Sequence, residues 1–145
     1  MPRIFTRAAA TVAALAAGVQ PRTVSVLSKK DVSPNGIWPG KDGSLLMAGF
    51  VAADKPRAFF SMGRDGALKS LSQPIGRLDG LYEMRDGGLL ATDWNTGSLF
   101  RWTEKGGVQA LAKDFKGPAD FCVMGDTVYV PDLVKSEVRV VRLGK

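Results

Sequence analysis

The sequence contains a threefold internal repeat, which restricts the possible folds more than any other feature of the chain. The three units begin at Asn35, Asp79 and Asp120, so that successive units start 44 and 41 residues apart. In the first two units an aromatic residue, Phe50 or Trp94, stands 15 residues after the opening polar residue. Repeats of this length are usually copies of one supersecondary unit stacked side by side.

Within each unit the pattern predicts consecutive antiparallel strands. Asp42-Gly43 and Asp86-Gly87 have the composition of hairpin turns, because glycine adopts positive φ without strain and aspartate tolerates the neighbouring position. Short apolar runs follow both turns and predict strands that are covered on both faces. The second, third and fourth predicted strands span residues 45–50, 58–62 and 68–71, then 89–94, 98–102 and 108–111, then 128–133 and 136–143.

Four short strands in a period of about 40–45 residues are typical of a β-propeller blade. A generic meander or sandwich shares the strand count and the turns. It does not explain why the turn, the apolar run and the aromatic residue recur in one order. We therefore predict an all-β fold in which residues 23–145 form about three four-stranded antiparallel blades of a six-bladed type.

The number of blades is too small for a closed ring. Thr23–Ser28 is predicted to be the outermost strand of a blade that is otherwise absent, and the last unit has only three strands. Propellers close with typically 4–8 blades, so a partner must complete the ring. One candidate is a second copy, with Thr23–Ser28 of each chain filling the last blade of the other. The other candidate is a missing amino-terminal half.

The first 20 residues differ in composition from the rest. Arg3 and Arg7 precede a charge-free, alanine-rich stretch from Ala8 to Val19. A basic head, a short apolar stretch and small residues predict a secretory signal peptide, and the stretch is too short to span a bilayer. The alternative is an unstructured leader. A cleaved signal would make the protein periplasmic or secreted, whereas the alternative would leave it cytoplasmic.

The chain has no histidine and a single cysteine, Cys122. Ser-His-Asp and Cys-His catalysis, histidine-ligated metals and internal disulfides are therefore excluded within these residues. The formal net charge is +6, but the basic residues are scattered along the sequence. Nucleic-acid binding needs a concentrated basic patch, so no nucleic-acid partner is expected.

The repeat units carry a resemblance to a known family. The run from Leu78 to Arg101, with Gly117-Pro118-Ala119-Asp120 and Tyr129-Val130-Pro131, resembles the carboxyl-terminal half of the senescence-marker-protein/gluconolactonase/luciferin-regenerating-enzyme family. The unit around Asn35 resembles the preceding blade. The resemblance covers about residues 23–145 and implies a six-bladed propeller. It also implies one divalent cation, calcium or zinc, at the mouth of the central channel.

The same resemblance suggests site residues. Asn35 matches an asparagine ligand, and Asp79 matches an aspartate that holds the cation and acts as general base on water. Asp120 occupies the equivalent point of the next unit and is a third candidate ligand facing the channel. Trp38, near the channel mouth, is a candidate substrate-binding residue. Oxygen ligands suit a hard cation. The family's glutamate ligand comes from earlier blades, which this chain lacks.

Structural roles compete with each of these functional interpretations. An Asn-Gly or Asp-Gly pair is first of all a turn whose side chain bonds nearby backbone N–H groups. Trp38 and Trp94 also suit packing between neighbouring sheets. Two function classes follow: a metal-dependent hydrolase of a lactone or small ester once the ring is complete, or a non-catalytic binding or scaffold module, a truncated remnant included. The absent acidic residue of the first blade favours the second class.

Overall fold

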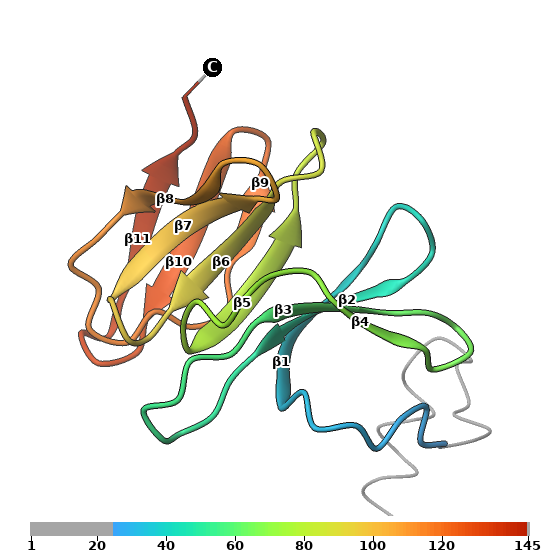
Figure 1. Ribbon diagram of the computed structural model, residues 1–145. Helices are drawn as coiled ribbons and strands as arrows, with labels where there is room; N and C mark the ends of the chain where they lie inside the picture. Colours follow the sequence, from blue (N-terminus) through green and yellow to red (C-terminus); the bar gives the residue numbers. More distant parts are fainter. Residues whose placement is uncertain (1–24, 145) are drawn as a thin grey trace, which may run out of the picture.

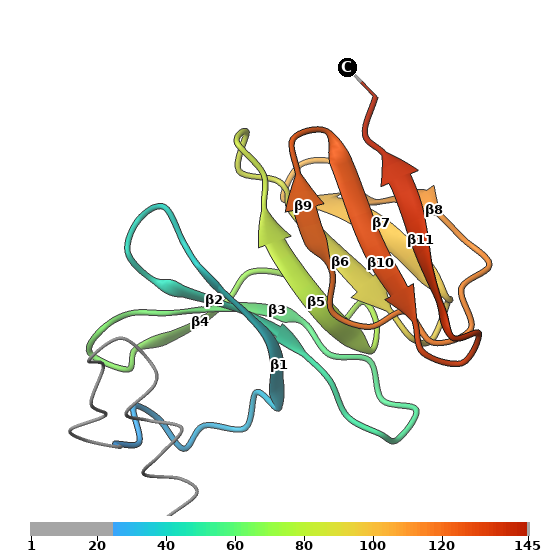
Figure 2. The same cartoon turned by 180° about the vertical axis from the view of Figure 1, so that it is seen from behind.

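The computed structural model describes residues 25–144, which form eleven β-strands in three antiparallel sheets (Figure 1). Each sheet is one propeller blade, and the blades stand side by side without closing into a ring (Figure 2). The predicted all-β class and the predicted blades are therefore confirmed. No helix long and apolar enough to cross a membrane occurs between residues 25 and 144.

The three blades follow the order of the sequence. In blades 1 and 2 each strand pairs with the next along the chain, and blade 3 has three strands in the order β9, β10, β11. Blade 1 contains β1 (Pro34–Pro39), β2 (Leu45–Gly49), β3 (Phe59–Met62) and β4 (Leu68–Ser70). Blade 2 contains β5 (Leu78–Glu83), β6 (Leu89–Asp93), β7 (Ser98–Thr103) and β8 (Gly107–Ala112). Blade 3 contains β9 (Cys122–Met124), β10 (Thr127–Asp132) and β11 (Glu137–Arg142).

The hairpin turns between the first two strands of blades 1 and 2 are those that the Asp-Gly pairs predict. Gly43 and Gly87 have φ of 83° and 84°, a region that favours glycine. The Asp42 carboxylate accepts a hydrogen bond of 2.9 Å from the Ser44 N–H. The Asp86 carboxylate accepts one of 3.0 Å from the Gly88 N–H. Local side-chain bonding and glycine freedom together fix these turns.

The core lies between the blades, and blade 2 contributes to both halves of it. Alternate residues of a strand point to opposite faces of its sheet. Leu89 and Ala91 of β6 accordingly pack against blade 1, whereas Leu90 packs against blade 3. The apolar run of β6 is thus buried on both sides, as its sequence predicts. The buried residues of the two clusters are Leu46, Ala48, Phe59, Leu78, Leu81, Leu89, Ala91 and Phe100, and then Leu90, Leu99, Phe115, Val128 and Val130.

The innermost strands approach each other closely at two glycines. A Cβ atom on Gly36 of β1 would overlap the carbonyl oxygen of Asp79 in β5. A Cβ atom on Gly80 would lie 2.5 Å from the ring of Phe121. Neither glycine has a positive φ, so glycine is required here for space. The missing side chains allow the glycine backbone to pack directly against the next blade.

Buried aspartates secure the entry to blades 2 and 3. The Asp93 carboxylate, at the end of β6, accepts hydrogen bonds from the Arg77 N–H (2.8 Å), the Asn95 N–H (3.0 Å) and the Thr96 hydroxyl (2.7 Å). Asp132, at the end of β10, accepts bonds from the Lys116 N–H (2.8 Å) and the Gly117 N–H (2.9 Å). Both carboxylates are almost completely buried. Each therefore ties the segment before its blade to the second strand of that blade.

The structure describes the segment before blade 1 from Ser25 onward. Thr23–Ser28 was predicted to be a strand, but its described part, Ser25–Ser28, is not in a strand. Val32, just after it, is buried against Met47 and Met62 on the outer face of blade 1. This anchor keeps the segment beside blade 1, where no sheet edge of the described residues pairs with it. The predicted signal peptide or leader at residues 1–20 lies outside the described residues.

The close approach at Gly36 predicts a large effect of a small substitution. Gly36→Ala should lower the free energy of unfolding by about 1–3 kcal/mol, because the added methyl group must displace backbone rather than a flexible side chain. Denaturant unfolding followed by tryptophan fluorescence measures this change. Gly144→Ala, where the methyl group meets no atom within 4 Å, is the control and should be neutral. Equal stability of the two variants would contradict the packing described for β1 and β5.

The role of the buried aspartate in blade 2 is tested by an isosteric change. Asp93→Asn should destabilise the fold by about 1–3 kcal/mol, because the amide replaces one acceptor oxygen and leaves a buried donor without its partner. Chemical denaturation at neutral pH provides the measurement. Asp54→Asn, at an exposed position, should change the stability by a few tenths of a kcal/mol at most. A denaturation midpoint of Asp93→Asn equal to that of the wild type would show that the Asp93 carboxylate does not stabilise the entry to blade 2.

Candidate functional site

The polar residues that open the three units come from neighbouring strands at one end of the blades. Asn35 lies in β1 and Asp79 in β5, and each stands at an irregularity in the pairing with the next strand. Asp120 comes two residues before β9. The interpretation of Asn35-Gly36 and Asp79-Gly80 as turns is therefore wrong. They lie in strands, where the absence of a Cβ on Gly36 and Gly80 leaves space for atoms of the neighbouring blade.

Asp79 is the centre of this polar cluster, which we define as Asn35, Asp79 and Asp120. Its carboxylate is half-buried and accepts a hydrogen bond of 2.9 Å from the Trp94 indole N–H. Burial is the largest influence on its pKa and raises it, and the charge of Asp120 raises it further. Hydrogen bonds from Trp94 and the Asn35 amide act in the opposite direction and do not offset these effects. The pKa of Asp79 is therefore raised above its ordinary value.

Asp120 is exposed, as is Asn35, whereas Asp79 is half-buried. Its carboxylate accepts a hydrogen bond of 2.9 Å from the Phe121 N–H. Its Cα atom lies 3.1 Å from the position of a Cβ on Gly80, so the chain before β9 passes directly against β5. The structure thus brings Asn35, Asp79 and Asp120 together from three consecutive blades.

The donor set of this cluster fits a hard cation. Two carboxylates and one amide supply oxygen atoms only, which calcium and magnesium prefer. The neighbouring charge of Asp120 raises the pKa of Asp79, and a cation between the two carboxylates would stabilise their ionised forms. Within residues 25–144 there is no group of three or more His, Cys, Asp or Glu side chains placed to hold a metal ion. The cluster therefore offers part of a coordination shell, with Asn35 as its third oxygen donor.

Trp38 takes a packing position in the structure. Its ring lies 4.7 Å from that of Tyr82, centroid to centroid, and packs against the core cluster between blades 1 and 2. The described contacts of Trp38 are with Tyr82 and with the apolar side chains of this cluster. A substrate-binding role for Trp38 stays a prediction.

Trp94 is a site residue that the sequence interpretation assigned to packing alone. It does pack, since its ring meets that of Phe50 edge-on with centroids 6.2 Å apart. Its N–H also orients the Asp79 carboxylate. The signal was the repeated 15-residue spacing, which places the residue after β6 beside the polar residue of β5.

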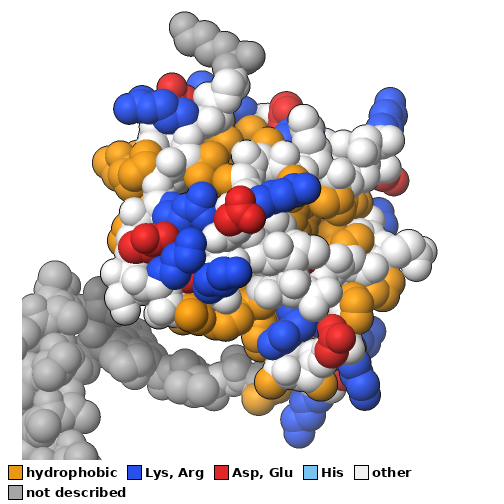
Figure 3. All heavy atoms as spheres, turned by 90° about the vertical axis from the view of Figure 1, so that its left-hand side faces the viewer, with side chains coloured by type: hydrophobic (Ala, Val, Ile, Leu, Met, Phe, Trp, Pro, Cys, Tyr) orange, Lys and Arg blue, Asp and Glu red, His pale blue; other side chains and the backbone are white. Residues whose placement is uncertain are grey.

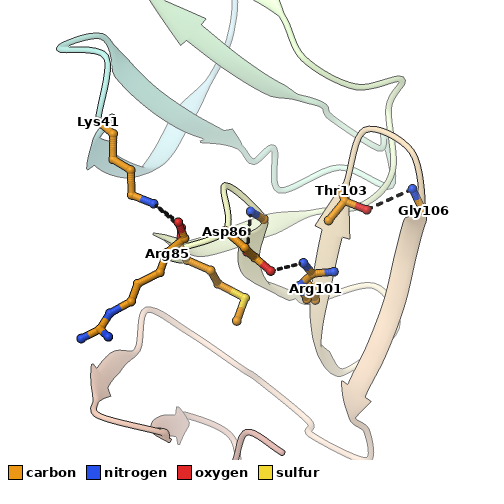
Figure 4. A network of polar contacts seen from close by, with 8 residues as sticks. Lys41, Arg85, Asp86, Arg101, Thr103 and Gly106 are labelled. Atoms are coloured by element: carbon orange, nitrogen blue, oxygen red, sulfur yellow. Dashed lines mark hydrogen bonds and ion pairs between the residues drawn. The ribbon is translucent and has the colours of Figure 1, made fainter. Parts of the chain in front are cut away.

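A second polar network lies at the opposite end of the blades, around the β5–β6 hairpin (Figure 4). The Lys41 ammonium group donates to the carbonyl oxygens of Met84 (2.6 Å) and Arg85 (2.8 Å), and Arg101 pairs with Asp86 at 2.6 Å. A groove of about 610 Å³, with Leu71 and Trp102 among its lining residues, adjoins this network. Lys41 ties the hairpins of blades 1 and 2 together, so the network has a structural role.

The fold defines the class of protein as a β-propeller, of which residues 25–144 form three blades. No family model and no curated protein matches the chain. A gluconolactonase from Xanthomonas campestris is 16% identical with a TM-score of 0.64 over 81% of this chain and 46% of its own. Virginiamycin B lyase from Staphylococcus aureus is 16% identical with a TM-score of 0.54, over 81% of this chain and 43% of its own. At this identity the likeness shows the fold.

The likeness also bears on the extent of the propeller. The chain spans less than half the length of these two proteins. The predicted resemblance to gluconolactonase-like propellers is therefore confirmed at the level of the fold, and the described blades correspond to part of such a ring.

The indole–carboxylate contact can be tested directly. Trp94→Phe should raise the pKa of Asp79 further, because the N–H that stabilises the ionised carboxylate is lost. Carboxyl carbon NMR shifts followed through a pH titration report this pKa. Trp102→Phe, which changes a tryptophan at the other end of β7, should leave it unaltered. A lowered or unchanged pKa in Trp94→Phe would contradict the proposed orientation.

Proposed function

We propose that this chain is part of a gluconolactonase-like propeller that hydrolyses a lactone or small ester with the help of a divalent cation, calcium or zinc, once its ring is complete. The observation that supports this most is the convergence of Asn35 of β1, Asp79 of β5 and Asp120, two residues before β9, from three consecutive blades. The ring would be completed by a second copy or by an amino-terminal half. The likeness to a gluconolactonase supports the fold on which the proposal rests.

The roles of the residues follow from their environments. Asn35, Asp79 and Asp120 would hold the cation, which supplies polarisation of a carbonyl and acidification of water. Asp79 would take a proton from water, and its raised pKa makes its carboxylate a stronger base than an exposed aspartate. The Trp94 N–H fixes one oxygen of the Asp79 carboxylate. Further ligands and substrate contacts would come from the completing half.

The alternative is a non-catalytic binding or scaffold module with the same fold. The small number of ligands in the three described blades favours it, because two or three donors hold a cation weakly. Lyase chemistry of the virginiamycin B type has less support. A variant of that lyase with one histidine changed to alanine is described as catalytically inactive, and this chain has no histidine.

Cation binding is the first step that the proposed hydrolase requires, and it can be tested by itself. Millimolar calcium should raise the thermal unfolding midpoint of the wild-type chain by a few degrees, because a ligand that binds only the folded state stabilises it. Asp79→Asn should abolish the shift while retaining an acceptor for the Trp94 N–H. Asp54→Asn, remote from the cluster and exposed, should keep the wild-type shift.

The same experiment distinguishes binding from catalysis. A calcium or zinc shift that depends on Asp79, together with hydrolysis of γ- or δ-lactones, supports the hydrolase. A shift without hydrolysis supports the binding module. Absence of a shift with both metals, in wild type and variants alike, would rule out the cation site.

A further inference from the structure

The outer face of blade 3 is apolar and uncovered among the described residues. The strand register places Cys122, Tyr129 and Val140 in one row and Pro131 and Val138 in the next, all on the face away from blade 2. Val138 and Val140 are 65% and 56% exposed, and Met124 on the same face is 65% exposed. In Figure 2 this sheet faces the viewer with no other element in front of it. Figure 3 shows apolar side chains among Lys and Arg side chains on the adjoining side of the molecule.

Blade 3 also has an unpaired strand edge. Blades 1 and 2 have four strands, but among residues 25–144 blade 3 ends at β11, which pairs only with β10. The missing strand can be short, since β4 of blade 1 has three residues. An unpaired strand edge exposes backbone N–H and C=O groups, and an uncovered apolar face exposes hydrophobic area to water. Together they favour association with another strand and sheet.

The chain itself carries a segment of suitable length and exposure. Ser25–Ser28 is not in a strand, and its Val26 and Leu27 are 69% and 48% exposed. It lies on the outer side of blade 1, and Figures 1 and 2 both place it at the opposite side of the molecule from β11. Sheets pack about 10 Å apart, so blade 3 is at least about 20 Å beyond blade 1. The chain from Leu27 to buried Val32 makes five residue steps and reaches at most about 18 Å. The segment cannot pair with its own β11 while Val32 stays buried.

We propose that two copies of this chain close one ring, with the outer face of blade 3 of each copy covering the outer side of blade 1 of the other. In each junction Ser25–Ser28 of one copy pairs with β11 of the other and supplies its fourth strand. The second copy is the occupant because the three blades cover 46% of a gluconolactonase chain, so two copies account for nearly all of one ring. A contact between blade 3 of one copy and blade 1 of the next leaves one blade uncovered at each end unless the copies form a closed ring. Here two copies are enough to close the ring.

The assembly would also complete the polar cluster. A two-fold axis along the channel places a second Asn35, Asp79 and Asp120 opposite the first set. This consequence rests on the proposed function, whereas the pairing itself rests on the exposed face and the free edge. The two ideas therefore fail separately: a ring without a calcium shift refutes only the site.

The mass of the chain in solution is the first measurement. Light scattering over a range of concentrations should give twice the chain mass for the wild type, falling toward one chain on dilution. Val138→Lys combined with Val140→Lys should raise the dissociation constant of the dimer at least about tenfold, because two charges would be buried in the junction. Val108→Lys, at a valine of β8 that is 51% exposed, is the matched control and should dimerise like the wild type.

Cys122 reports whether the dimer uses this face. The thiol is exposed in the single chain and shares the outer face of β9 with Met124. Its alkylation by iodoacetamide should be slow where the dimer dominates and fast in the double lysine variant. A dimer in which Cys122 reacts at the same rate at all concentrations would show that another surface pairs, and it would overturn the proposal.

The added strand has its own test. Leu27→Pro removes a backbone N–H that strand pairing needs, so it should weaken the dimer more than Leu27→Ala. Far-ultraviolet circular dichroism of both variants checks that the blades remain folded. A wild-type chain that stays at one chain mass at every concentration, or a dimer unaffected by the lysine substitutions, would refute the ring of two copies.

Discussion

Blade-to-blade packing in this protein depends on the absence of a side chain at two points of the innermost strands. At Gly36 and Gly80 the next blade fills the space that a Cβ would occupy. The polar residue before each glycine also lies where the innermost strands of neighbouring blades approach each other, because adjacent residues on a strand are only about 3.3 Å apart. The approach that builds the core thus also brings Asn35, Asp79 and Asp120 together. The candidate site is a consequence of how the blades pack.

The sequence could predict the local elements because their causes are local. Asp42-Gly43 forms the predicted hairpin turn. Gly43 has a positive φ, and the Asp42 carboxylate accepts a hydrogen bond from the Ser44 N–H. Asp79-Gly80 has the same composition and lies inside a strand. The difference comes from Phe121, 41 residues away, which occupies the space beside Gly80. A contact of that separation is not visible in a dipeptide, and this explains why the turn interpretation failed there.

The site was predicted in part for a related reason. The repeat places Asn35, Asp79 and Asp120 at equivalent points, so their convergence follows once the blades are accepted. The partner of Asp79 did not follow, because Trp94 suits packing by composition, and only the register of β5 against β6 directs its N–H to the carboxylate. Ser25–Ser28 is not in a strand in the single chain, because no edge of the three described sheets pairs with it.

Two aspartates of the same chain show how environment separates structural from chemical roles. Burial acts to raise the pKa of Asp132, but hydrogen bonds from three backbone N–H groups outweigh it and hold the pKa below its ordinary value. Its contribution to stability is present above the unfolded-state pKa, near 3.8, and is lost as the pH falls through the lowered folded-state pKa. Asp79 has one indole donor, the Asn35 amide and a neighbouring carboxylate, and its pKa is raised. Its ionised form is destabilising in the folded chain, and a cation or a proton relieves that cost. The backbone thus satisfies Asp132, whereas the proposed cation would satisfy Asp79.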